Sequence, residues 1–94
     1  MKVKITRTNT NLYVIGKTTY SGNLTTIHKP YEIIQGLEGI QIIPMDQHLL
    51  GKELEYISIN NEFVIYSEEP SNDIRNVYLE TISGLDIPKQ ELII

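Results

Sequence analysis

Apolar residues occur along this chain in short runs that alternate with polar residues, and turn-forming residues separate the runs. Alternation with a period of two is typical of strands that bury one face. No stretch carries a sustained 3.6-residue repeat, and we expect 46–51 to be a loop or a single helical turn. The pattern predicts extended segments at these positions: 1–11 as an arm or short strand, 12–20, 23–27, 31–34, 39–45, 53–59, 62–67 and 75–82.

Glycine and asparagine mark the turns between these segments. Gly22-Asn23 and the pair Gly36 and Gly39 bracket two of them. Asn60-Asn61 predicts a type I′ hairpin across 54–67, because asparagine tolerates the positive φ angles of that turn. Closely spaced short strands predict a mainly β protein, a small barrel or sandwich, and a closed barrel leaves few exposed edges.

Composition supports one small β domain, 1–94. Branched residues are abundant and alanine is absent, which favours strands over helices. The chain has no cysteine, and no apolar run reaches the ~20 residues of a membrane span. The start, MKVKITR, lacks the apolar core of a signal peptide, so we expect a cytoplasmic protein with no membrane partner. The tail 84–94 is apolar enough to pack on its own subunit or on a neighbour.

Charge is unevenly distributed along the chain. The segment 1–31 carries +5 without an acidic residue, and the remainder carries −9. Such asymmetry favours either a basic face for an anionic partner, or contacts in which unlike surfaces of neighbouring subunits meet.

Catalytic and cofactor motifs are weak. Gly16-Lys17-Thr18 matches the end of a phosphate-binding P-loop, but Asn11 stands where that motif needs its first glycine, and apolar strand residues fill the interval. His28, His48 and Asp46 are metal-ligand types without ligand spacing, so we interpret them as surface residues. No nucleophile elbow is present, and we expect no enzyme, no cofactor and no small-molecule substrate.

A longer window, VIGKTTYSGNLTTIHKPYEII, resembles the first signature segment of Sm-like proteins. Its matching positions are Gly16, Gly22, Leu24 and the loop His28–Glu32. The segments 63–67 and 76–82 are similar to the last two strands of that family, although Tyr66-Ser67 replaces its arginine-glycine step. Over nearly the whole chain the sequence looks most like the small, divergent Sm-like proteins of cyanophages.

The resemblance implies a strongly bent, five-stranded SH3-type barrel. It also implies a homo-oligomeric ring of about five to seven subunits, in which the fourth strand of one subunit pairs with the fifth strand of the next. The residues expected at this interface come from the last two predicted strands: Phe63, Val64, Ile65, Tyr66, Val77, Tyr78 and Leu79.

The resemblance further implies single-stranded RNA binding at His28, Lys29, Tyr31 and Glu32. Tyr31 would stack on a base and Lys29 would contact phosphate. His28 and Glu32 stand where the family has aspartate and asparagine, and an ionised Glu32 only accepts hydrogen bonds. Two hypotheses follow: a phage ring that binds RNA, or a ring-shaped scaffold that binds protein partners and no RNA.

Overall fold

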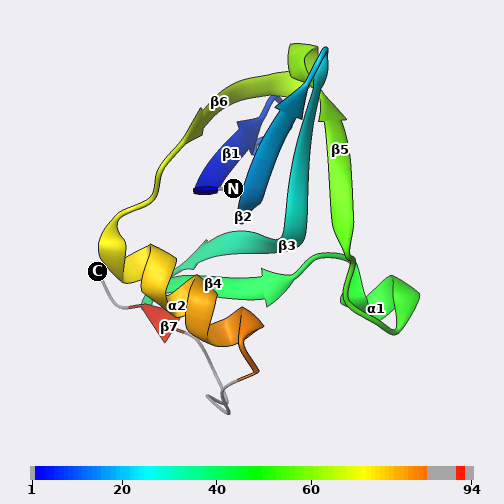
Figure 1. Cartoon of the computed structure of the whole chain (residues 1–94). Helices are drawn as coiled ribbons and strands as arrows, with labels where there is room; N and C mark the ends of the chain where they lie inside the picture. The colour runs from blue at the N-terminus through cyan, green and yellow to red at the C-terminus, as the bar shows by residue number, and fades with distance from the viewer. Residues whose placement is uncertain (1, 85–90, 93–94) are drawn as a thin grey trace.

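The computed structural model describes residues 2–84 and 91–92, and it is mainly β, as predicted (Figure 1). In chain order the elements are β1 (Lys2–Thr8), β2 (Tyr13–Ser21), β3 (Leu24–Gly36), β4 (Gly39–Pro44), α1 (Gln47–Leu50), β5 (Tyr56–Asn60), the 3₁₀ turn η1 (Asn61–Phe63), β6 (Val64–Glu68), α2 (Asn72–Ile82) and β7 (Glu91–Leu92). The segment expected as an arm or short strand is β1, which lies between β2 and β6.

The strands form an antiparallel sheet in the order β6-β1-β2-β3-β4-β7, and β5 also pairs with β3. The long strand β3 pairs with two strands along the same edge. Its first part, Leu24–His28, pairs with β5, and its second part, Tyr31–Gly36, pairs with β4. Within the described residues β5 and β6 form no ladder with each other, although η1 joins them. The sheet is therefore not closed into the predicted barrel.

A sharp bend in β3 produces this arrangement. Lys29 has a φ of 50°, in the left-handed region, and Pro30 follows it without a backbone N–H. The Lys29 N–H donates to the carbonyl of Glu55, which directly precedes β5, at 2.8 Å. The two segments predicted at 23–27 and 31–34 are consequently one continuous strand with a corner.

Gly16 faces the inside of this corner. The pairing of β2 with β3 shifts register between Ile15 and Lys17, and Gly16 is buried there. A Cβ atom at Gly16 would collide with the Ile27 side chain and lie 2.6 Å from the His28 carbonyl oxygen. The tripeptide Gly16-Lys17-Thr18 lies inside a strand, and its glycine permits close packing of two backbones.

Apolar side chains pack on both faces of the sheet. Successive residues of a strand point to opposite faces, so Ile15 and Val14 enter different clusters. One cluster is covered by α2 and has these buried members: Val3, Ile15, Tyr31, Ile42 and Tyr78. The other cluster lies on the opposite face and has Val14, Ile27 and Met45 as its buried members. The parts of β2 and β3 that carry Val14, Ile15, Ile27 and Tyr31 are thus covered from both faces.

The predicted last strand at 75–82 is wrong, because these residues form α2. Ser71 caps the helix, and its hydroxyl accepts the Ile74 N–H at 3.4 Å. The helix then places one apolar stripe against the first cluster, with Ile74, Val77, Tyr78 and Ile82 at helical spacing. The alternation of Val77 and Leu79 suggested a strand and concealed this spacing.

The predicted hairpin at Asn60-Asn61 is also wrong. Asn60 has an extended backbone with a φ of −64°, and its side chain accepts the Glu62 N–H at the start of η1. The strands on either side of η1 separate, and β5 pairs with β3 while β6 pairs with β1. The turns at Gly22 and at Gly36–Gly39 are present as predicted.

The segment 46–51, expected as a loop or a single helical turn, contains the helical turn α1. Of the tail 84–94, Glu91–Leu92 pairs with Ile40 and Gln41 of β4, and 85–90 and 93–94 lie outside the described residues.

We expect Gly16→Ala to lower the free energy of unfolding by about 1–3 kcal/mol, because the new methyl group overpacks the corner. Urea denaturation measures this change. Gly36→Ala is the matched control, since its nearest atom beyond the chain neighbours would be the Gly39 carbonyl oxygen at 3.7 Å. It should shift stability by no more than about 0.5 kcal/mol. Equal stability of the two variants would contradict the role assigned to Gly16.

Candidate functional site

Two tyrosines, Tyr31 and Tyr78, pack at the corner of β3. Tyr78 of α2 is fully buried, and its hydroxyl donates to the Lys29 carbonyl at 2.8 Å and lies 3.2 Å from the His28 carbonyl. The Tyr31 ring lies edge-on to the Tyr78 ring, with centroids 5.8 Å apart. The Tyr31 hydroxyl donates to Glu53 Oε1 at 2.7 Å. The helix, the corner and the segment before β5 therefore meet at one point.

Burial keeps both phenols neutral. It raises the pKa of Tyr31 far above the ordinary value, and the hydrogen bond to Glu53 and the charge of that carboxylate raise it further. Burial raises the pKa of Tyr78 to about 12, partly opposed by the Lys17 backbone N–H and assisted by the charge of Glu53. Both hydroxyls act as hydrogen-bond donors inside the fold.

This geometry decides where the predicted RNA residues lie. Tyr31 is 3% exposed, so its ring offers no face on which a base could stack. His28 and Glu32 are half-buried, and Lys29 is exposed at the corner. His28 and Lys29 therefore remain accessible beside one another, while Tyr31 belongs to the core. Leu24 begins β3 and is exposed directly after the turn at Gly22, which has a φ of 58°.

An open face on β2, β3 and β5 carries the residues that a ligand could reach. Lys17, His28 and Tyr56 stand opposite one another across these three strands. Tyr56 is 59% exposed, and its ring centroid lies 6.2 Å from that of His28. The sheet register places a hydroxyl row beside this one, Thr19, Thr26 and Ser58. We call Lys17, His28 and Tyr56, together with Lys29 at the adjoining corner, the strand face.

Sequence reasoning missed Tyr56, although a signal was present. In the run Tyr56-Ile57-Ser58-Ile59 the isoleucines alternate with two residues that can face solvent. The isoleucines pack against the second cluster, and this packing turns Tyr56 outward. The accessible aromatic next to His28 is therefore on β5 and not at the position that the family pattern indicated.

The predicted interface residues separate into two groups. Phe63, Ile65 and Tyr66 are exposed on η1 and β6, by 46%, 55% and 37%, and Val64 is half-buried among them. The other three residues lie in α2 and contact the first cluster of their own chain: Val77, Tyr78 and Leu79. The strand that 76–82 was expected to supply for pairing does not exist, and only the first group remains available to a second subunit.

The exposed apolar residues lie on an open edge strand of the sheet, β6, and on the last residue of η1 directly before it. Strand β6 pairs only with β1, and β5 pairs only with β3, among the residues that the structure describes. Unpaired N–H and C=O groups beside apolar side chains form a template for pairing with another chain. We call Phe63, Val64, Ile65 and Tyr66 the edge patch.

Within the described ranges 2–84 and 91–92, no group of three histidine, aspartate or glutamate side chains gathers as metal ligands. No helix within those ranges is long and apolar enough to cross a membrane. Neither a protein-family model nor a curated protein sequence matches the chain. The function is therefore inferred from the geometry of the strand face and the edge patch.

Proposed function

We propose that the chain is a non-catalytic assembly subunit that pairs the β6 edge of one copy with the β5 edge of the next. The observation that carries this proposal is the edge patch, in which exposed apolar side chains on β6 and on the last residue of η1 lie beside a strand edge that has no partner among the described residues. Ile65 and Phe63 are about half exposed, so covering either one contributes roughly 1 kcal/mol, about half the value for burying a whole side chain. A small domain with limited core gains stability from such contacts.

The arrangement of the edges favours a ring. Each copy offers β6 on one side of the sheet and β5 on the other, so the contact joins two different surfaces. Contacts of this kind repeat from copy to copy, and they close into a ring when the rotation between copies permits. Rings of about five to seven subunits are part of the proposal, in line with the Sm-like resemblance.

The order of the strands in the sheet supports the Sm-like part of the proposal. The strands β5-β3-β2-β1-β6 form a bent antiparallel array whose first and last members are joined by η1 (Figure 1). In this proposal β5 and β6 take the pairing roles that the family resemblance implied for 63–67 and 76–82. In this proposal the five strands correspond to the Sm-like barrel in an open form, and the strand β4 and the helix α2 are elements outside those five strands.

A second function, single-stranded RNA binding, is supported by the strand face. Tyr56 presents an exposed ring on which a base could stack, Lys17 brings positive charge to the same row, and Lys29 adds an exposed charge at the adjoining corner. The proposal moves the stacking role from Tyr31 to Tyr56, because Tyr31 is buried and Tyr56 is exposed next to His28. A ring would repeat this face once per subunit, and several weak contacts would act together.

Ile65→Lys should weaken self-association, because a charge at the centre of the edge patch must lose its water when two edges pair. Light scattering at several protein concentrations measures the mass. Leu37→Lys is the matched control, since Leu37 is fully exposed in the β3–β4 turn and lies away from both edges. We expect oligomers for the parent chain and for Leu37→Lys, and smaller species for Ile65→Lys. A monomeric parent chain would refute the assembly proposal.

For RNA, we expect a uridine-rich oligonucleotide to bind at low salt and to dissociate as salt rises. Tyr56→Ala should weaken binding by roughly tenfold, because base stacking contributes about 1–3 kcal/mol. Fluorescence anisotropy of a labelled strand provides the measurement, and His48→Ala, an exposed position in α1, is the control. The RNA function fails if the strand does not bind at low salt, or if both variants bind equally.

A further inference from the structure

A groove with three cationic side chains lies between the sheet and α2. It adjoins the first cluster, since Val3 and Leu79 belong to both. Its charged walls are Lys2 of β1, Lys17 of β2 and Arg75 of α2, and Asn76 adds an amide. Val3 and Leu79 supply its apolar part, and its volume is about 460 Å³. Glu69 is the acidic residue in its lining. Three positive charges and one negative charge thus line a groove in a chain whose net charge is −4.

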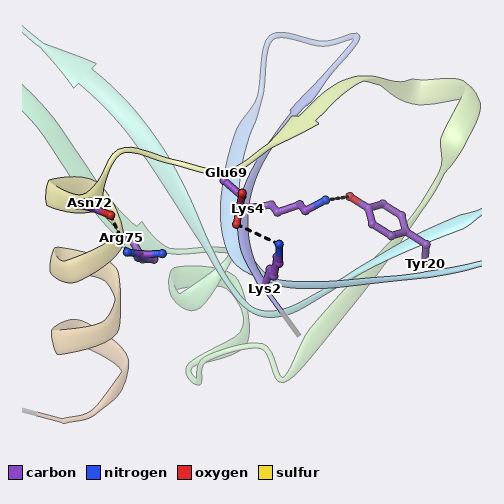
Figure 2. A network of polar contacts seen from close by, with 6 residues as sticks. All are labelled: Lys2, Lys4, Tyr20, Glu69, Asn72 and Arg75. Atoms are coloured by element: carbon purple, nitrogen blue, oxygen red, sulfur yellow. Dashed lines mark hydrogen bonds and ion pairs between the residues drawn. The ribbon is translucent and has the colours of Figure 1, made fainter.

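The acidic residue, Glu69, forms an ion pair with Lys2. Glu69 Oε1 lies 3.6 Å from Lys2 Nζ, and both side chains are largely exposed, so this pair contributes little. Figure 2 shows Lys2 and Glu69 meeting across from α2, with Arg75 leaving the helix on the side that faces them.

Arg75 uses one nitrogen to donate to the neutral Asn72 amide oxygen at 2.6 Å. In the described part of the chain, neither Arg75 nor Lys17 forms an ion pair with a carboxylate. Two cations therefore share a groove without a counter-charge of their own.

The chemistry of the donors indicates the ligand. A guanidinium presents a planar fork of N–H groups and suits oxyanions, and ammonium groups add charge from other directions. Lys2, Lys17 and Arg75 approach from three different elements, an arrangement that suits an anion with oxygens on several sides. A volume of about 460 Å³ exceeds that of a bare oxyanion and leaves room for a small substituent against Val3 and Leu79.

We propose that this groove binds a phosphate group, with Lys17 and Arg75 as its principal ligands and Lys2 as a third. The proposal is independent of self-assembly, because β1, β2 and α2 of one chain supply every residue named. The phosphate can belong to a small phosphorylated molecule or to the backbone of a nucleic-acid strand. Lys17 also belongs to the strand face, so a strand held there could place a phosphate in the groove.

The test is an amide chemical-shift titration of the full chain at low, matched ionic strength. The probes are inorganic phosphate, glycerol phosphate as a monoester and dimethyl phosphate as a diester, with sodium chloride as the baseline. We expect saturable shifts at the start of β1, the middle of β2 and the first two turns of α2. Tighter binding of the monoester identifies a small phosphorylated ligand as the source, and tighter binding of the diester identifies a strand backbone.

Variants locate the site. Lys17→Gln and Arg75→Gln should each weaken phosphate binding about threefold or more, and the double variant should lose saturation, because each removes one charged ligand. Lys52→Gln removes an exposed cation that does not line the groove, and it should bind like the parent chain.

The amide spectrum of each variant reports whether it is folded, and Lys17→Gln alone suffices if Arg75→Gln unfolds. The proposal is overturned if no probe gives saturable shifts, or if Lys52→Gln weakens binding as much as Lys17→Gln.

Discussion

The hydrogen bond from the buried Tyr78 hydroxyl to the Lys29 carbonyl is the interaction on which the rest of the structure depends. Lys29 adopts a left-handed backbone conformation, which is unfavourable for a residue with a Cβ atom, and a packed neighbour must stabilise it. Tyr78 supplies this support from α2, and Gly16 allows β2 to approach the corner from the other side. The corner is therefore fixed jointly by a helix and by a glycine.

The corner in turn determines what the molecule exposes. It allows the first half of β3 to pair with β5 and the second half with β4, so β5 and β6 remain open edges in the described chain. It draws Tyr31 into the core and leaves Lys29 at the surface next to His28. The edge patch and the strand face are both consequences of one bent strand, and α2 adds the cationic groove.

Local patterns predicted the strands well where a single rule applied. Short apolar runs located β2 and β4, and glycines located the turns, because these features depend on neighbouring residues. The helix α2 was missed because Val77 and Leu79 alternate like residues of a strand, and this alternation hid the helical spacing of Ile74, Val77, Tyr78 and Ile82. The hairpin predicted at Asn60-Asn61 was wrong because its two strands pair with strands that are distant in sequence. The strand β5 pairs with β3, and β6 pairs with β1.

The candidate site was predictable in part. The window around His28 and Lys29 was identified, since those residues lie on a short loop-like corner. The burial of Tyr31 was not predictable, because it depends on Tyr78, which was assigned to a strand on another surface. Charge counts showed that the first third of the chain is basic, but the groove also needs Arg75, which only the helix brings near Lys2 and Lys17.

The most direct measurement is the free energy of unfolding of Tyr78→Phe, which keeps the ring and removes only the hydroxyl group. The account predicts a loss of about 1–3 kcal/mol, because the Lys29 and His28 carbonyls would lose a buried donor. Tyr56→Phe, at an exposed ring, should change stability by no more than about 0.5 kcal/mol. Equal stability of Tyr78→Phe and the parent chain would show that the corner does not depend on this hydrogen bond.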